Sequence, residues 1–138
     1  MEVAHVYLCG NYCDYTDHFS YGIVIYFMDQ KYSIKGSMNN GPFIYMKNVG
    51  GGIVGCIEAI KTCIAYGYKK VVIHHRLICL ETLISGKNKP QKCQLYEYIN
   101  FMKNIANKIE VTFKYVKSKD EEIKYEEAKQ LSRDILGI

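Results

Sequence analysis

Hydrophobic residues in the first 40 positions recur at the spacing of β-strands. Residues 3–8 form an apolar run rich in β-branched and aromatic side chains, and residues 21–28 form a second one. Residues 31–38 alternate in character after the polar pair at 29–30, which predicts that the second and third strands form a hairpin. The polar, turn-rich residues 11–20 predict a loop. Three strands are therefore expected before any helix.

The hydrophobic period changes near residue 51. Isoleucines then recur at steps of three and four residues, at positions 53, 57, 60 and 64. This spacing is typical of an amphipathic helix, and we expect it to end near Gly67. A short continuous apolar run follows at 71–75 and predicts a strand inside a parallel sheet.

The rest of the chain alternates helix and strand patterns. Helical patterns at 77–84, 91–107 and 121–136 surround a further strand at 110–116. The predicted order is βββαβααβα, which implies an α/β fold with a five-stranded mixed sheet flanked by helices. Loops are short and no linker interrupts the pattern, so we expect one domain over residues 1–138.

Composition narrows the class of protein. The chain has 138 residues, of which 49% are hydrophobic and 23% charged, and these values exclude a disordered chain. Its 18 Lys and Arg exceed its 14 Asp and Glu, and the net charge of +4 permits polyanion binding without requiring it. The six cysteines form no CxxC pair, the amino terminus lacks a signal-peptide pattern, and the apolar runs are strand-sized. We expect reduced thiols in a cytoplasmic protein without a membrane segment.

Five short segments, in order along the chain, look like the motifs of one known family. They are residues 7–11 (YLCGN), 19–24 (FSYGIV), 48–52 (NVGGG), 71–76 (VVIHHR) and 113–119 (FKYVKSK) with 126–131 (EEAKQL). The first four are similar to a YxDGS-type strand, a tyrosine-glycine-aliphatic strand, an NVAGE-like helix start and a VxIxxD-like strand end. The last pair is similar to an FxxVKxH strand end followed by EEAD. Together they resemble the ribonuclease H family, in its cellular and viroplasmin-like branch, and imply a ribonuclease H-like fold.

In active members of that family, four carboxylates bind two magnesium ions. The resemblance places their positions at Cys9, Gly52, Arg76 and Lys129, and the family's mobile histidine at Lys119. None of these residues is acidic or histidine. Magnesium needs hard oxygen ligands, whereas glycine offers no side chain, a thiol is soft and cations repel the ions. We therefore expect a catalytically inactive domain with no metal and no cofactor.

Two groups of basic residues are candidates for binding nucleic acid in such an inactive domain. In active relatives, the loop and helix after the third catalytic position help hold the backbone of the RNA/DNA hybrid, and that segment carries three lysines here. Other cations would stand where metal ions met phosphate. The candidate contacts to hybrid or duplex nucleic acid are Asn11, Asn48, Arg76, Lys87, Lys89, Lys92, Lys119 and Lys129. Leu83 and Asn88 replace the family's tryptophans, so a protein partner stays as the other prediction.

Three alternatives to this hypothesis stay open. A divergent nuclease would use relocated carboxylates at Asp14, Glu81 or Asp120, although we expect the acids of this chain, Glu121 included, to be solvated surface residues. A transition-metal site would pair Cys9 with a histidine, but adjacent histidines leave a strand on opposite faces. The third alternative is a purely structural subunit of a protein complex.

Residues 50–55 (GGGIVG) also have the GxGxxG spacing of a dinucleotide-binding turn. The acid that should end the following strand is missing, because that strand ends in His74-His75-Arg76. We expect these glycines instead to allow two backbones to approach closely.

Overall fold

Five strands form one mixed sheet in the order β3-β2-β1-β4-β5. The computed structural model describes residues 2–41, 43–86 and 95–138. Its strands are β1 (Ala4–Cys13), β2 (His18–Phe27), β3 (Gln30–Met38), β4 (Lys70–His75) and β5 (Glu110–Tyr115). The three amino-terminal strands are antiparallel, whereas β4 pairs in parallel with both β1 and β5. The predicted α/β class and mixed sheet are confirmed.

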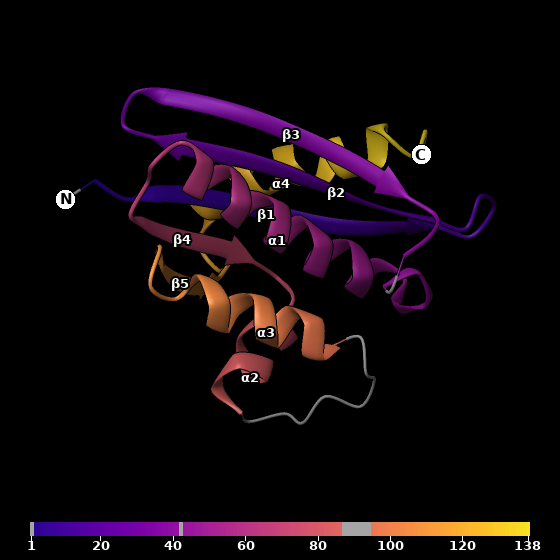
Figure 1. Cartoon of the computed structure of the whole chain (residues 1–138). Helices are drawn as coiled ribbons and strands as arrows, with labels where there is room; N and C mark the ends of the chain where they lie inside the picture. Colours follow the sequence, from indigo (N-terminus) through magenta and orange to yellow (C-terminus); the bar gives the residue numbers. More distant parts are fainter. Residues whose placement is uncertain (1, 42, 87–94) are drawn as a thin grey trace.

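Helices cover both faces of this sheet (Figure 1). They are η1 (Ile44–Met46), α1 (Asn48–Ala65), α2 (Cys79–Ser85), α3 (Leu95–Ile105) and α4 (Lys119–Asp134). Helix α1 packs on β1 and β2 with α2 and α3 beside it, and α4 packs on the opposite face. The element order is the predicted one with η1 added. Residues 91–94 of the predicted third helix lie outside the described residues.

The hairpin of β1 and β2 is longer than predicted. Its register runs from His5 opposite Tyr26 to Cys13 opposite His18, so the loop prediction for residues 11–13 and 18–20 is wrong. Phe19 and Ser20 are fully buried beside exposed polar residues of the turn, and the backbone groups pair across the hairpin. Side-chain polarity alone therefore conceals the pairing.

The main core lies between the sheet and α1. Ile53 and Ile60 of α1 pack there with Phe19 and Ile23 of β2, and all four are fully buried. By length and composition α1 is apolar enough to cross a membrane, with a hydropathy of 1.2 over 18 residues, but half of that window is buried inside the molecule. Its apolar character matches its place as the central core helix.

Glycines bring the helices against the backbone of the sheet. A Cβ on Gly10 would lie 2.4 Å from the amide nitrogen of Gly52, and one on Gly51 would lie 2.2 Å from the carbonyl oxygen of Ser20. The start of α1 therefore touches β1 and β2 directly, which confirms the predicted role of the glycine-rich segment. Since η1 and not a strand precedes α1, the dinucleotide-turn interpretation is wrong.

A buried polar chain anchors the amino terminus of α4. The hydroxyl of Ser118 accepts the backbone N–H of Glu121 at 3.2 Å, and one Glu121 carboxylate oxygen accepts the backbone N–H of Ser118 at 3.4 Å, so the two form a capping box. The other carboxylate oxygen lies 3.1 Å from Nδ1 of His74, whose Nε2 lies 2.9 Å from Nδ1 of His5. Glu121 is only 9% exposed, so the prediction of a solvated acid is wrong there.

The carboxylate fixes the proton positions along this chain. Because a carboxylate only accepts hydrogen bonds, His74 donates from Nδ1 and its Nε2 must accept from Nδ1 of His5. The His74 ring is also stacked on Tyr7, with ring centres 4.3 Å apart. The neutral His74 is therefore held between a strand and a helix.

Acidification should destabilise the protein through this chain. Burial lowers the pKa of His74 despite its bond to Glu121, and His5 and Lys114 lower it further. Burial alone would raise the pKa of Glu121, but hydrogen bonds from His74 and Ser118 lower it below its ordinary value. Both groups bind fewer protons when folded than when unfolded, so the stabilisation from His74 is lost as the pH falls below about 6.5, and that from Glu121 is lost only below about pH 4.5.

Urea unfolding between about pH 7.5 and about pH 5 tests this linkage. The unfolding midpoint of the unmodified chain should decrease with pH, and the decrease should be shallower in His74→Gln. An equally steep decrease in the variant would show that His74 is not the linked group.

Candidate functional site

Two adjoining cavities lie where β1, the end of β4, the start of α1 and one side of α4 come together. The lining of the smaller one, the inner cavity of about 70 Å³, includes Cys9, Gly52, His75, Arg76 and Tyr125. The lining of the larger one, the outer cavity of about 440 Å³, includes Asn11, Tyr12, Lys47, Asn48 and Lys129. Cys9, Gly10, Asn48 and Tyr125 line both, so the cavities form one continuous site.

The four positions that the resemblance assigns to catalysis meet at this site. Cys9, Gly52 and Arg76 line the inner cavity, and Lys129 joins Cys9 in the outer one. A Cβ on Gly52 would lie 2.6 Å from Cδ2 of Leu77. An acidic side chain therefore needs a displacement of Leu77 before it can be accommodated at position 52.

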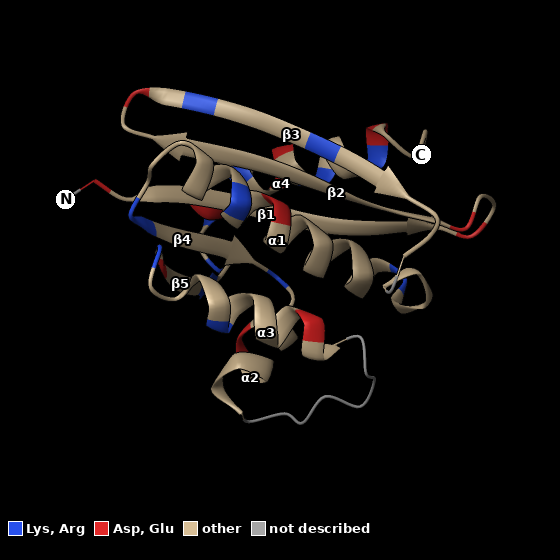
Figure 2. Cartoon of the chain, in the orientation of Figure 1, with Lys and Arg blue, Asp and Glu red and all other residues tan. Residues whose placement is uncertain are grey.

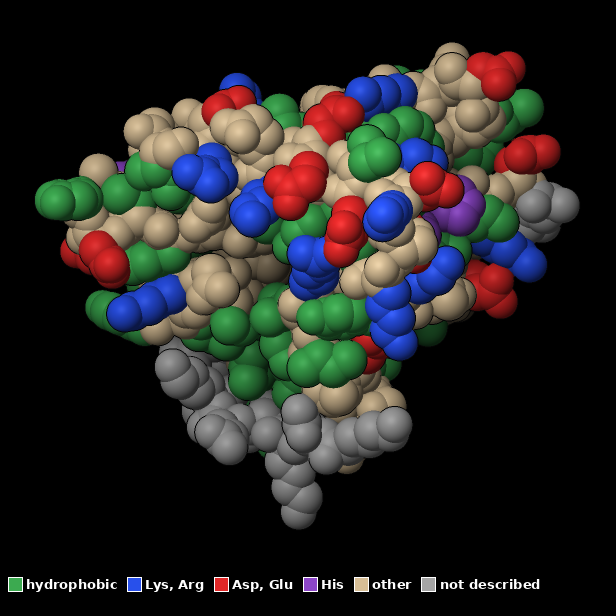
Figure 3. Space-filling view, turned by 180° about the vertical axis from the view of Figure 1, so that it is seen from behind, with side chains coloured by type: hydrophobic (Ala, Val, Ile, Leu, Met, Phe, Trp, Pro, Cys, Tyr) green, Lys and Arg blue, Asp and Glu red, His purple; other side chains and the backbone are tan. Residues whose placement is uncertain are grey.

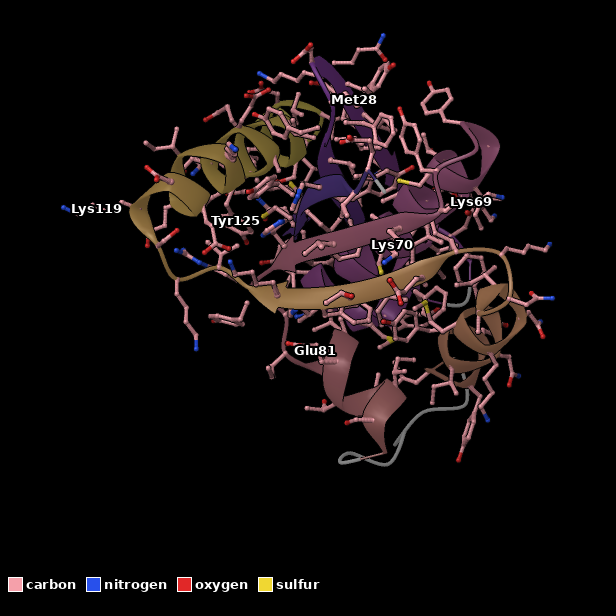
Figure 4. The ribbon with its side chains drawn as sticks, turned by 90° about the vertical axis from the view of Figure 1, so that its left-hand side faces the viewer. Met28, Lys69, Lys70, Glu81, Lys119 and Tyr125 are labelled. Carbon is pink, nitrogen blue, oxygen red and sulfur yellow. The ribbon has the colours of Figure 1, made fainter. Side chains whose placement is uncertain are left out.

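The predicted nucleic-acid contacts separate into three groups. Asn11, Asn48 and Lys129 line the outer cavity, and Arg76 lines the inner one. Lys119, the first residue of α4, is not among the described lining residues of either cavity, and Figure 4 shows its side chain pointing outward. The loop lysines lie outside the described residues: Lys87, Lys89 and Lys92.

Tyr125 fills the space between the inner cavity and α4. Figure 4 shows it between α4 and the sheet, and its hydroxyl donates to Sγ of Cys9 at 3.4 Å. Burial raises the pKa of Tyr125, so the phenol stays protonated and acts as the donor. The Arg76 guanidinium stands 5.0 Å from the centre of the same ring, at a distance typical of a cation–π contact.

Arg76 is not an unpaired cation. One of its terminal nitrogens lies 2.7 Å from a carboxylate oxygen of Glu122, which is in the first turn of α4. Its charge is therefore partly compensated, and the expectation that Arg76 offers a point charge to phosphate loses support. The lining of the inner cavity therefore includes the Tyr125 ring and an Arg76 guanidinium that is already paired.

The outer cavity gathers hydrogen-bond donors. Lys47 and Lys129 supply two ammonium groups, and Oδ1 of Asn11 accepts the backbone N–H of Tyr12 at 2.8 Å, which leaves the amide nitrogen as the donor. Helix α1 starts beside them with neither a side-chain cap nor an acid in its first turn. In Figure 2 a basic segment (blue) lies at this start, and an acidic segment (red) lies at the tip of the β1–β2 hairpin. Asp14, in that tip, also lines the outer cavity.

This donor set suits an anion. Lysine, asparagine and the amino-terminal end of a helix are the groups that bind phosphate oxygens in proteins. Acidic and basic side chains are interspersed over the face seen in Figure 3, so that face does not gather one sign of charge.

The alternative metal sites are not assembled in the described part of the chain. Across residues 2–41, 43–86 and 95–138, no three His, Cys, Asp or Glu side chains come together as ligands. Asp14, Glu81 and Asp120 belong to the hairpin turn, α2 and α4, respectively. His75 accepts the Leu77 backbone N–H through Nδ1, at 3.0 Å.

The two neighbouring histidines leave β4 on opposite faces, as predicted. His74 contacts Glu121 of α4, whereas Nε2 of His75 lies 3.1 Å from a carboxylate oxygen of Glu81 in α2. Cys9 and His75 both line the inner cavity, but the thiol is already bonded to Tyr125. The Cys9 thiol and Nδ1 of His74 therefore have hydrogen-bond partners, whereas the buried Nε2 of His75 lies close to Glu81 without forming a hydrogen bond.

Solved structures resemble this arrangement over the whole chain. Ribonuclease H1 from the halophilic archaeon Halobacterium salinarum NRC-1 has a TM-score of 0.78 at 13% identity, with 97% of each chain covered. The N-terminal ribonuclease H domain of Rv2228c from Mycobacterium tuberculosis has a TM-score of 0.76 at 13% identity, with 97% of this chain and 93% of that one covered. The chain has the ribonuclease H fold.

A third ribonuclease H structure adds a ligand to the comparison. LC11-RNase H1, isolated from compost by a metagenomic approach, was solved in complex with an RNA/DNA hybrid. Its TM-score is 0.68 at 13% identity, with 97% of this chain and 99% of that one covered. No protein-family model and no curated protein matches the sequence significantly. At such identity the likeness establishes the ribonuclease H fold and not the reaction.

Sequence reasoning missed two residues of the site. Tyr125 precedes Lys129 by four residues and so shares its helix face, a signal that could have been used. Lys47 comes directly before the glycine-rich start of α1, but nothing in the sequence shows that its backbone has a φ of 56° there. Both depend on where the start of α1 and one side of α4 lie at the end of the sheet.

Replacing Tyr125 should uncover the thiol of Cys9. Tyr125→Ala removes the ring that covers it and should lower the free energy of unfolding by about 3 kcal/mol, by analogy with other buried aromatic truncations. Tyr125→Phe keeps the ring, should lower it by about 1 kcal/mol and should leave Cys9 protected. Iodoacetamide labelling of the folded protein, followed by mass spectrometry of the Cys9 peptide, measures this. Equal labelling of Cys9 in the alanine variant and the unmodified chain would refute the covering role.

Proposed function

We propose that this ribonuclease H-fold domain binds the phosphate backbone of nucleic acid at the outer cavity and does not hydrolyse it. The convergence of Lys47 and Lys129 with the asparagine amides and the uncapped start of α1 supports the proposal most directly. Phosphate contacts fix a protein on nucleic acid without reading its sequence. A backbone binder with little sequence preference follows from this donor set.

The proposal of inactivity rests on the ligands that two-metal cleavage requires. Two ions roughly 3.5–4 Å apart must be held by oxygen atoms, mostly carboxylates. At the positions that the resemblance indicates, this chain has Cys9, Gly52, Arg76 and Lys129. The Tyr125 hydroxyl donates to Cys9, and the Glu122 carboxylate pairs with Arg76, so both of these side chains already have partners within the protein.

An RNA/DNA hybrid is the first ligand to test, because LC11-RNase H1 was solved with one. Two lysines that each neutralise one phosphate would give a slope of log affinity against log salt of roughly −2. Binding of this kind is weak at physiological salt, so the measurement belongs at low ionic strength.

A protein partner is the second candidate. An apolar groove of about 460 Å³ lies between α3 and β5, and its lining includes Ile84, Ile99, Met102, Ile105 and Val111. Grooves of this kind accept apolar side chains of other proteins. A domain that binds no nucleic acid at low salt would favour this candidate.

Neutralising the lysines of the outer cavity should weaken hybrid binding. Lys47→Gln and Lys129→Gln should each reduce affinity for a fluorescently labelled hybrid and flatten the salt slope by about one. The matched control is Lys69→Gln, which removes the same charge from an exposed lysine directly before β4, far from Tyr125 in Figure 4. Anisotropy titrations over a series of salt concentrations give both quantities. An effect of the control as large as that of Lys129→Gln would mean that only net charge matters.

No hydrolysis is expected from the purified chain. An RNA/DNA hybrid incubated with magnesium or manganese should stay intact, while LC11-RNase H1 in parallel verifies that the substrate is cleavable. Hydrolysis that a chelator abolishes would contradict the proposed inactivity. The proposed binding would still be tested by the titrations.

A further inference from the structure

A third cavity opens beside the outer one. This side pocket of about 290 Å³ is lined by Tyr12, Asp17, Asn39, Ile44, Tyr45 and Lys47. Tyr12 and Lys47 also line the outer cavity, so the two are continuous. A volume near 300 Å³ is at the lower end of small-ligand sites, large enough for one aromatic ring system with its substituents.

The aromatic walls of the side pocket are held in different ways. The Tyr12 hydroxyl donates to a carboxylate oxygen of Asp17 at 2.7 Å, and this bond raises the pKa of Tyr12 to about 12. The ammonium of Lys47 stands 5.6 Å from the centre of the Tyr12 ring. Tyr45, in contrast, is 84% exposed. One ring is therefore fixed in place and a second stands open to solvent.

The backbone around the side pocket is unusual. Among the described non-glycine residues, positive φ angles occur at Asp17 (53°), Met28 (54°) and Lys47 (56°). Two of these three line the side pocket. Such conformations are sparsely populated, and they tend to persist where a ligand site needs a side chain in a fixed direction.

We infer that the side pocket binds one unpaired nucleobase of a single-stranded nucleic acid whose phosphates lie in the outer cavity. Every base has a π-face, so tyrosine rings stack on bases with little sequence preference. Asn39 and Asp17 offer an amide and a carboxylate to the polar edge of the base. Lys47 stands between the two cavities, where the ribose and phosphate would pass.

Charge distinguishes this ligand from others of similar shape. Lys47 and Asp17 balance each other in the lining of the side pocket, which suits a ring without net charge, whereas Lys47 and Lys129 outnumber Asp14 in the outer cavity and favour a polymer with anions next to its rings. A base inside an intact duplex is already paired and stacked, so it cannot enter without opening the helix. The inference rests on the proposed backbone binding and deepens it by naming the ligand as single-stranded.

A short oligonucleotide with one 2-aminopurine base tests the side pocket. Stacking on tyrosine should quench the fluorescence of this base when the full-length chain binds. Tyr45→Ala should lose about fivefold or more in affinity and most of the quench, because one stacking face is gone. Tyr15→Ala is the matched control: Tyr15 is 99% exposed on the turn of the same hairpin and is not among the described lining residues of the three cavities.

Tyr12→Phe gives a second variant that keeps both rings. It should retain the quench within about twofold, because stacking needs the ring and not the hydroxyl. The inference is overturned if Tyr45→Ala binds the single strand as tightly as the unmodified chain does, or if binding leaves the fluorescence unchanged.

The outcomes separate this inference from the proposed function. Salt-dependent binding of a blunt hybrid that Lys129→Gln weakens, without quench of the single strand, would overturn the base pocket and leave backbone binding standing. Absence of binding for both ligands at low salt would overturn both.

Discussion

The backbone of β1 and β2 touches the first turn of α1 with no side chain between them. A Cβ on Gly10 would stand 2.5 Å from the Asn48 carbonyl oxygen, and one on Gly51 would stand 2.2 Å from the Ser20 carbonyl oxygen. A side chain larger than the hydrogen atom of glycine would clash with the facing backbone at both positions. It places the unpaired N–H groups of the helix start beside the polar end of the hairpin, and the outer cavity and side pocket both follow from that placement.

On the opposite face of the sheet, a glycine again brings a helix against the backbone of a strand. A Cβ on Gly22 would lie 1.9 Å from the carbonyl oxygen of Ala128, so α4 also rests on the backbone of β2. The Ser118–Glu121–His74 chain then fixes where α4 begins. Because both its start and its middle contact the sheet, α4 is held in an orientation that places Tyr125 over Cys9. The packing of α4 on the sheet therefore determines which of its side chains line the inner cavity.

Much of this architecture could be predicted from the sequence, because the hydrophobic period and the positions of glycines determine local secondary structure and close backbone contacts. The order of strands and helices follows from spacing alone, and the motif order led to Cys9, Gly52 and Arg76 as neighbours. The extended hairpin could not be predicted in this way, since its pairing is made by backbone groups under polar side chains. Glu121 likewise reads as a surface acid, because its burial depends on His74, a residue 47 positions away.

The Tyr125–Cys9 contact has a consequence for how the domain can change. A carboxylate introduced at position 9 would face the Tyr125 hydroxyl and accept a hydrogen bond from it, so it would be satisfied without a metal ion. A carboxylate at position 52 would first have to displace Leu77. The side chains that already line the inner cavity therefore oppose an added carboxylate at both positions, by a hydrogen bond at position 9 and by a steric contact at position 52.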